Sequence, residues 1–600
     1  MNPPSLGLPS TVRFGGLWIM LCGSLFAQAP TTMVPLVRGT HEMVAAANNF
    51  EVEAGYRILT QGGNAVDAGV ASVLAAGVTE LSRFGLGGEM PALIKMAGRP
   101  PVAISGVGVA PAKATVEFYA KRSPEAWEDS RNMPPIPVQG ILSAITPGVF
   151  DGLILALEQY VTKSFAEVAE PAIEYAEQGF PMPEEFAEML EGYQRILALW
   201  PDSLKFFYPD GAPTPRGQIF REPELARTLK ELVAAEKKAH GKRADKLRAV
   251  HDLFYKGSIA KRIAASSEKN GGLIAYNDLA GFHAEADPPR MGIYRGYEVY
   301  KPGFWTQGPV MIETLNLIEG FDLKAMGHNS PQYLHTVVEA LKLAFADRDR
   351  YYGDPKFSKI PEEILLSKNY AAERRKLIDP MHASLEHRPG NLAAPILLPS
   401  TTAKSEGPVN DTTCVNVVDR QGNAFSATPS GAWLPSVIAG DTGIPLTTRL
   451  QSFVMTAGHP NQLQPGKRPR VTLSPTLVTR GGKLEMILST PGGDNQDQAL
   501  LQVLLNVIEF GMSPQEAVEA PRFQTEHFYS SFGNHEFVPG RLNLEGRISK
   551  STAESLAALG HRVVVTGDWS NGSAPTVIWT HDGVLDGGAD PRRARFVFGR

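Results

Sequence analysis

Hydrophobic positions near the start of the chain follow first a strand-like and then a helical pattern. Residues 43–47 (Met-Val-Ala-Ala-Ala) form a short apolar run, which predicts a buried strand. Apolar residues within 52–59 recur at helical spacing, and the glycine-containing segment 61–64 ends that helix. Residues 65–78 are rich in Ala and Val throughout, so this second helix is expected to be buried on most sides.

The middle of the chain is predicted to be mainly helical and is more strongly charged. Residues 150–270 carry most of this helical pattern, and the Glu/Lys/Arg spacing within 225–238 indicates a solvated helix face. Residues 294–300 alternate in the manner of a single strand, whereas residues 335–347 predict an amphipathic helix.

A polar segment leads directly into a predicted hairpin in the second half. Residues 380–411 are rich in Pro, Gly, Ser and Thr, which predicts an exposed, mobile loop. Apolar residues 415–419, the Gly-containing turn 421–423 and residues 424–428 then predict two antiparallel strands. A mobile loop that runs straight into a core strand is an accessible place for chain cleavage.

Composition agrees with a large globular protein and does not favour nucleic-acid binding. The chain has 600 residues, of which 43% are hydrophobic and 20% are charged, and its formal net charge is −5. Mean hydropathy is −0.14. No basic run is present that would hold a phosphate backbone, so nucleic acid is not an expected partner.

Residues 1–29 have the features of a secretory signal peptide. Arg13 precedes the apolar run 14–26, and Ala27 and Ala29 provide an A-x-A pattern, which places cleavage near residues 27–29. A transmembrane anchor is the alternative, but the apolar run is short for a hydrocarbon core about 30 Å thick. We therefore expect export to the periplasm or the extracellular space, and no integral membrane segment once the signal is cleaved.

The chain contains two cysteines, Cys22 and Cys414. Cys22 lies within the predicted signal, so the mature protein is expected to have no internal disulfide. This agrees with a bacterial periplasm but does not identify one. No Cys/His group has a metal-ligand spacing in the sequence, so a structural zinc is not expected. Catalysis by a threonine and its own α-amino group would need neither a metal nor an organic cofactor.

Asp411-Thr412-Thr413 lies at the joint between the loop and the hairpin. A threonine hydroxyl needs an adjacent base to act as a nucleophile. If the bond after Asp411 breaks, the new α-amino group of Thr412 provides that base, because it titrates near pH 8. The tripeptide is common, however, and by itself is also typical of a turn that opens a strand.

From residue 43 to the end, the chain resembles the γ-glutamyltranspeptidase (γ-glutamyltransferase, glutathione hydrolase) family, including its acylase-like relatives. Nine segments carry the resemblance in order along the chain. They are Gln61–Ala68, Gly85–Gly88, Gly271–Leu273, Tyr294–Val299, Leu343–Arg348, Pro465–Pro469, Leu473–Thr476, Pro491–Gly493 and Gly587–Arg593.

The resemblance implies a fold and a catalytic centre. The expected fold is α/β, an N-terminal-nucleophile hydrolase with a four-layer αββα sandwich that both subunits build after autoproteolysis. Cleavage between Asp411 and Thr412 would give a large subunit, 30–411, and a small subunit, 412–600. Thr412 matches the catalytic threonine, Ser430 the supporting hydroxyl, and Gly492 and Gly493 the pair whose N–H groups form the oxyanion hole.

The substrate pocket departs from the family more than the catalytic centre does. Segment 105–111 lacks the arginine that usually binds the substrate's α-carboxylate. Ser452 replaces the aspartate expected to pair with the α-ammonium, and a charge left unpaired in a closed site is costly. Val471 and Thr472 occupy the positions of a serine pair in the family, and Ala432 occupies the position of a family asparagine.

Arg449 is a candidate for binding a carboxylate, with a structural ion pair as the equal alternative. Ser452 and Thr472 complete the candidate substrate-binding residues. Trp305 and Trp433 are expected either to line the pocket or to be buried in the core.

Three functions therefore stay open. The first is a γ-glutamyltransferase-type enzyme that cleaves or transfers a γ-glutamyl-type group to water or an amino acceptor. The second is an acylase or amidohydrolase with the same Thr412 mechanism and a small-molecule amide that is not glutamyl. The third is an inactive binding protein, which the presence of Thr412, Ser430, Gly492 and Gly493 argues against.

Overall fold

The computed structural model describes residue 1, residues 32–130, 133–160, 162–393, 396 and 398, and residues 411–600. Most of the predicted signal peptide, and residues 394–395, 397 and 399–410 of the predicted loop, lie outside these residues. In the part of the chain that is described, no helix is long and apolar enough to cross a membrane.

Two seven-stranded antiparallel sheets form the centre of the molecule. The first sheet has the order β1 (Val37–Gly39), β18 (Val584–Ala589), β17 (Thr576–His581), β13 (Lys483–Ser489), β12 (Thr476–Arg480), β9 (Tyr297–Lys301), β8 (Arg290–Tyr294). The second has the order β19 (Phe596–Gly599), β2 (Met43–Ala46), β10 (Val415–Val418), β11 (Ala424–Ala427), β3 (Met90–Lys95), β4 (Val102–Gly106), β7 (Glu285–Asp287).

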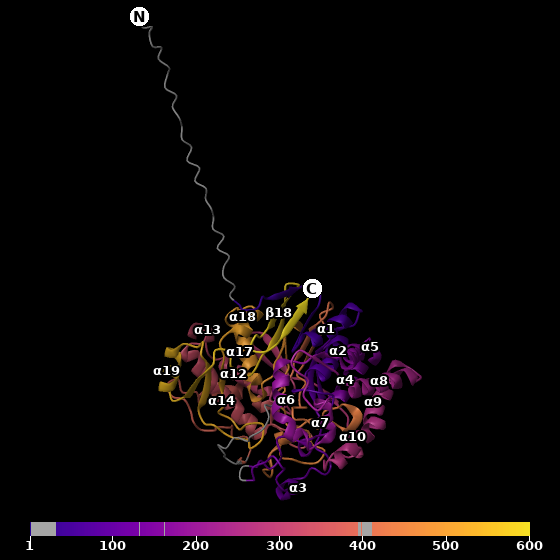
Figure 1. The fold of residues 1–600 in the computed structure, drawn as a ribbon. Helices are drawn as coiled ribbons and strands as arrows, with labels where there is room; N and C mark the ends of the chain where they lie inside the picture. Colours follow the sequence, from indigo (N-terminus) through magenta and orange to yellow (C-terminus); the bar gives the residue numbers. More distant parts are fainter. Residues whose placement is uncertain (2–31, 131–132, 161, 394–395, 397, 399–410) are drawn as a thin grey trace.

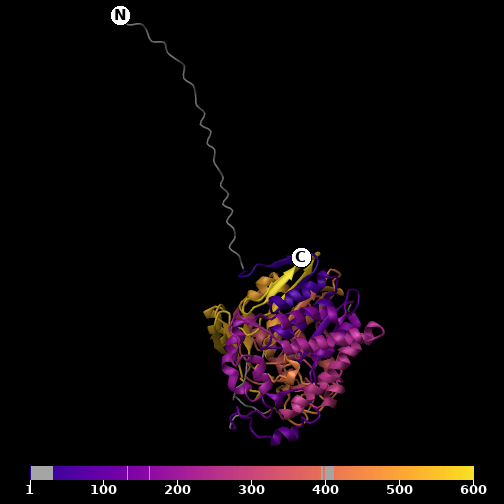
Figure 2. The same ribbon diagram turned by 45° about the vertical axis from the view of Figure 1, so that its right-hand side comes forward.

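Each sheet combines strands from both sides of Thr412. In the second sheet, β10 pairs on one side with β2 and on the other with β11, so the strand that follows Thr412 is central. The C-terminal strand β19 pairs with β2, and Figure 2 shows this yellow strand beside the indigo N-terminal elements. Chain segments before and after Thr412 therefore depend on each other for their hydrogen bonds.

Alternate residues of the strands face different hydrophobic clusters. In β2, Val44 belongs to a cluster with helices, whereas Met43 and Ala45 belong to a cluster shared with residues of the first sheet. In β13, Leu488 packs with helices and Ile487 belongs to that shared cluster. The period of two places one face of each strand toward the other sheet and the opposite face toward helices.

Helices cover the outer faces of both sheets (Figure 1). On the second sheet, α1 (Asn49–Thr60), α2 (Ala65–Thr79) and α4 (Val149–Tyr160) contact the strands, and α5 (Phe165–Gln178), α8 (Pro223–Lys238) and α9 (Arg243–Tyr255) pack outside these helices. On the first sheet, α12 (Pro309–Ile318), α17 (Gln496–Ile508) and α18 (Pro514–Glu519) contact the strands, and α14 (Pro331–Tyr351) packs outside α12. A smaller sheet of β14 (Phe523–Thr525), β15 (Arg541–Glu545) and β16 (Arg562–Thr566) adjoins the second group.

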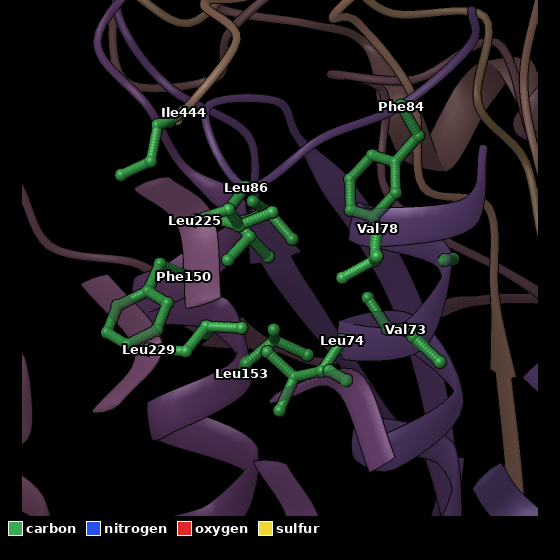
Figure 3. Close-up of a cluster of buried hydrophobic side chains, with 14 of the residues drawn as sticks. Val73, Leu74, Val78, Phe84, Leu86, Phe150, Leu153, Leu225, Leu229 and Ile444 are labelled. Carbon is green, nitrogen blue, oxygen red and sulfur yellow. The ribbon is translucent and has the colours of Figure 1, made fainter. Parts of the chain in front are cut away.

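Helix α2 lies in the centre of its layer, and all of its residues are buried, as its Ala/Val composition predicts. Figure 3 shows Val73, Leu74 and Val78 of α2 among side chains from α4 and α8. Asn64 caps the helix, and a Cβ on Gly69 would lie 2.2 Å from the ring of Phe425 in β11. Glycine is therefore required for this close helix–strand contact.

The predicted hairpin after Thr412 is confirmed as β10 and β11, joined by a turn in which Gly422 has a φ of 78°. The prediction of one strand over 294–300 is wrong, because this segment spans the turn between β8 and β9. Arg295 and Gly296, with φ values of 51° and 83°, form a tight turn that reverses the chain. The predicted helix 335–347 is longer than expected, as α14, and is buried on nearly all sides rather than amphipathic.

Candidate active site

Thr412 lies buried immediately before β10, with 2% of its surface exposed. It forms an isolated antiparallel bridge with Ser430, and the Thr413 amide donates to the Pro429 carbonyl at 3.0 Å. These contacts continue the β10–β11 pairing beyond both strands. The position of the predicted nucleophile is thus fixed by backbone pairing on a rigid sheet.

Ser430 connects Thr412 to the peptide bond that precedes it. Its Oγ lies 3.1 Å from Thr412 Oγ1 and donates to the Asp411 carbonyl oxygen at 2.8 Å. The same Oγ accepts a hydrogen bond from Arg449 Nη2 at 3.1 Å. Because a serine hydroxyl has one proton, which Asp411 receives, the Thr412 hydroxyl is the donor to Ser430.

The carbonyl of Asp411 receives two hydrogen bonds. Besides Ser430, the indole Nε1–H of Trp433 donates to this oxygen. Two donors directed at one carbonyl stabilise the negative charge that develops there when a nucleophile attacks. The predicted cleavage point therefore has the geometry of an oxyanion hole for its own carbonyl.

The Asp411 side chain is held by two arginines from distant segments. Its Oδ2 accepts from Arg83 Nε at 2.7 Å and also from Arg593 Nη1. Burial alone would raise the pKa of Asp411, but the Arg593 and Arg83 guanidinium groups outweigh burial and hold that pKa below its usual value. A cavity of about 770 Å³ is lined by both arginines.

Arg449 is fully buried in an ion pair with Glu89. Its Nε donates to Glu89 Oε1 at 2.5 Å, and Thr447 Oγ1 donates to the other carboxylate oxygen at 2.7 Å. The guanidinium also stacks over the Trp433 ring, 4.4 Å from its centroid. Burial raises the pKa of Glu89, and Arg449 opposes this shift. The structure thus shows the ion-pair alternative for Arg449, and its role in binding a substrate stays a prediction.

Gly492 and Gly493 form the turn between β13 and α17. Their φ values are 121° and 55°, and a Cβ at Gly492 would lie 2.1 Å from Ser573 Oγ. Gln496, the first residue of α17, reaches Thr412 Oγ1 with its Nε2 at 3.4 Å. This contact brings the segment that carries the glycine pair next to Thr412, although the oxyanion role of Gly492 and Gly493 remains a prediction.

The other two candidate pocket residues, Ser452 and Thr472, are buried. Neither hydroxyl has a hydrogen-bond partner among the described residues. Ser452 carries no charge, so the site lacks a carboxylate at this position. Their substrate-binding role is untested by the geometry and stays a prediction.

Several residues around Thr412 were not singled out by the sequence as functional. They are Arg83, Glu89, Gln496 and Arg593. Glu89 directly follows the glycine turn 85–88, and Arg593 closes the last segment that carried the resemblance, so both have a local signal. Arg83 and Gln496 become visible only through contacts between distant parts of the chain.

Comparisons with known proteins agree with this geometry. Residues 52–599 match the sequence model of the gamma-glutamyltranspeptidase family. The chain is 33% identical to the glutathione hydrolase proenzyme of Escherichia coli K12, with 97% of this chain and 98% of the relative covered. It is also 33% identical to the acylase ACY 1 proenzyme of Pseudomonas sp. SE83, with 92% of each chain covered.

Among solved structures, the cephalosporin acylase from Bacillus halodurans superposes with a TM-score of 0.81 and 28% identity, covering 100% of this chain and 99% of that one. Both glutathione hydrolases and acylases are thus similar to this protein over nearly its whole length. The chain belongs to the gamma-glutamyltranspeptidase family, an enzyme family of glutathione hydrolases and acylases.

Proposed function

We propose that the protein cleaves its own Asp411–Thr412 bond and then hydrolyses small-molecule amides through an acyl-threonine intermediate. The observation that carries this proposal is the position of Ser430 Oγ between Thr412 Oγ1 and the Asp411 carbonyl oxygen, at 3.1 and 2.8 Å. This arrangement supports a role for Thr412 as the hydroxyl nucleophile and for Ser430 as proton acceptor and oxyanion donor at the same peptide bond.

Autoproteolysis follows an N-to-O acyl shift. Thr412 Oγ1 forms a bond to the carbonyl carbon of Asp411, the peptide C–N bond breaks, and the hydroxyl proton ends on the Thr412 nitrogen. Ser430 and Trp433 hold the negative charge on the Asp411 oxygen during attack. Water then hydrolyses the ester, which leaves a carboxylate on Asp411 and a free α-amino group on Thr412.

Turnover repeats this chemistry on a bound amide. The Thr412 hydroxyl attacks the substrate carbonyl while its own α-amino group accepts the proton, and the amine product leaves. The N–H groups of Gly492 and Gly493 stabilise the oxyanion. Water, or an amino acceptor in a transfer reaction, then releases the acyl group. No step requires a metal or an organic cofactor.

The two subunits, 30–411 and 412–600, are proposed to stay associated in a four-layer αββα sandwich. Both sheets contain strands from each subunit, and the hydrophobic clusters on the two faces of each sheet support the layering. We also propose that residues 1–29 direct export to the periplasm or the extracellular space.

The surroundings of Arg449 favour an acyl group without an α-ammonium. Ser452 provides no negative charge, and the carboxylate of Glu89 is already engaged by Arg449 and Thr447. An ammonium buried without a partner would be strongly destabilised. The acylase relatives support this choice, whereas the glutathione hydrolase of E. coli supports γ-glutamyl cleavage as the second candidate.

Processing is tested on a denaturing gel with N-terminal sequencing of the smaller band. Wild-type protein should give two bands, the smaller beginning Thr-Thr-Cys-Val-Asn, and Thr412→Ala should give one full-length band. A single wild-type band would overturn the proposal and favour an inactive binding protein.

Substrate choice is tested with glutaryl and γ-glutamyl p-nitroanilides, which differ only in the α-ammonium. We expect a higher kcat/KM for the glutaryl compound. The reverse order would support γ-glutamyl specificity. Loss of turnover in Thr412→Ala assigns either activity to this residue.

A further inference from the structure

Two groups of imidazole and carboxylate side chains lie outside the candidate active site. The first, His335, Glu339 and His561, is buried, and His335 Nδ1 lies 2.9 Å from His561 Nε2. Lys342 and Arg388 donate to the Glu339 carboxylate at 2.6 and 3.0 Å. A cation placed there would face two positive charges, so this group is a poor metal site.

The second group is Asp151 on α4, His251 on α9 and His283 in the loop before β7. One ligand atom from each residue lies within 4.8 Å of the others. His251 Nε2 is 3.4 Å from Asp151 Oδ1, and His283 Nδ1 is 3.8 Å from Asp151 Oδ2. The three side chains come from distant segments, so no local spacing in the sequence indicates them.

His251 has the surroundings expected of a metal ligand. The residue is 7% exposed, and its Nε2 has no hydrogen-bond partner among the described residues, although buried polar atoms are normally paired. Its Nδ1 donates to Asp252 Oδ1 at 3.0 Å. In the tautomer with its proton on Nδ1 alone, this bond supports the ring and leaves the Nε2 lone pair available to a metal, as is usual for a metal-bound histidine.

The distances suit a small tetrahedral ion. Ligand bonds of about 2.0–2.1 Å in a tetrahedral zinc site place neighbouring ligand atoms about 3.3–3.4 Å apart. The His251–Asp151 separation of 3.4 Å already meets this value. The backbone N–H of Ala284 donates to Asp151 Oδ2 at 2.7 Å, which holds the carboxylate and the loop of His283 together.

Only His283 has to move. The His251 and His283 rings are nearly parallel, at 13°, with centroids 5.6 Å apart, and two parallel planes cannot both contain one ion. The His283 side chain is 64% exposed and has room to turn about its side-chain torsions. Buried Asp151 and His251 are fixed, so the site is formed except for one exposed ligand.

We propose that Asp151, His251 and His283 bind a Zn²⁺ ion, with a water molecule in the fourth position. Two imidazoles and one carboxylate match the ligand preference of zinc. The ion ties α4 and α9 to the loop that leads into β7, the edge strand of the second sheet. The site is structural and independent of the Thr412 chemistry.

The test uses tag-free full-length protein, treated with a chelator and dialysed, then titrated with Zn²⁺ by calorimetry and followed by thermal unfolding. Wild type should bind one equivalent and unfold at a higher temperature with zinc. In His283→Ala, binding should weaken at least tenfold and the thermal shift should disappear. Asp252→Asn should weaken zinc binding less than His283→Ala does, because it removes only the carboxylate that accepts from His251 Nδ1.

His240→Ala is the matched control, since His240 is an exposed histidine that belongs to neither group and should leave binding unchanged. Absence of zinc binding in wild type would overturn the proposal, and would leave His251 as an imidazolium paired with Asp151. Equal binding by wild type and His283→Ala would also overturn it. The proposal would also be overturned if His335→Gln lost zinc binding while His283→Ala retained it, because this result would assign the ion to the group of His335, Glu339 and His561.

Discussion

The indole of Trp433 donates its Nε1–H to the carbonyl oxygen of Asp411, the residue immediately before Thr412. Trp433 is itself held in place by the Arg449 guanidinium, which stacks on it and pairs with Glu89. The same Arg449 also donates to the Oγ of Ser430, which is the second group that donates to the Asp411 carbonyl. Both groups on the Asp411 carbonyl are therefore positioned by one buried ion pair.

Replacing Trp433 by Phe removes one donor and should slow autoproteolysis on the order of 100-fold, which is typical for loss of an oxyanion donor. The rate is measured as conversion of newly synthesised precursor to two bands. Trp305→Phe is the matched control, because Trp305 is equally buried but packs in a separate cluster with Val107, Val471 and Leu473. Equal processing rates in both variants, with similar thermal midpoints, would contradict this role of Trp433.

Ser430→Ala should block processing more strongly than Trp433→Phe. It removes both the donor to the Asp411 carbonyl and the acceptor of the Thr412 proton, so a loss of 100-fold or more is expected. Ser430→Thr keeps the hydroxyl and should retain processing. Rapid cleavage of the Ser430→Ala precursor would show that the proton follows another route.

Local patterns predicted the parts of the fold in which the spacing of apolar residues along the sequence matches the residues that the structure buries. The hairpin β10–β11 and helix α2 are confirmed because their apolar periods are uninterrupted and their turns contain Gly or Asn. The prediction of one strand over 294–300 failed because the alternation of the segment continues through Arg295 and Gly296, where the chain reverses. A period of two does not reveal a two-residue turn whose flanks keep the same phase.

The candidate site was predictable only where a residue adjoins a recognisable motif. Thr412 and Ser430 came from the resemblance, and the structure places their hydroxyl groups 3.1 Å apart. The pairing of Arg83 and Arg593 with Asp411 was not predictable, since it joins the two ends of the chain through tertiary packing. The ion pair of Arg449 with Glu89 has the same origin.

The Arg449–Glu89 pair should be costly to break. Both side chains are completely buried, so Glu89→Gln leaves a guanidinium without a counter-charge. We expect the free energy of unfolding to fall by about 3–5 kcal/mol. The measurement is urea unfolding in a Thr412→Ala background, which keeps the chain in one piece.

Glu373→Gln provides the comparison for Glu89→Gln. The Lys376–Glu373 pair is about 70% exposed on both side chains, and its loss should change stability by less than about 1 kcal/mol. Similar effects of the two substitutions would mean that Arg449 finds another partner or reaches water.

Acid should destabilise the protein in part through His459. Burial lowers the pKa of His459 to about 4, and its Nδ1 accepts from the Asn461 amide at 3.0 Å, which requires the neutral ring. Nε2 donates to the Asp349 carbonyl at 2.7 Å, and the nearby Arg470 charge further opposes protonation. The unfolded chain, with a histidine pKa of about 6.5, binds this proton more readily than the folded one.

The stabilising contribution of neutral His459 is therefore fully present above about pH 6.5 and is lost as the pH falls toward 4, on the order of 3 kcal/mol in all. Other buried histidines with lowered pKa values, such as His527, add to the same slope. Denaturant unfolding between pH 7 and 4 should show a smaller pH dependence in His459→Gln than in wild type. His240→Ala should keep the wild-type slope, and an unchanged slope in His459→Gln would mean that this ring does not remain neutral in the folded protein.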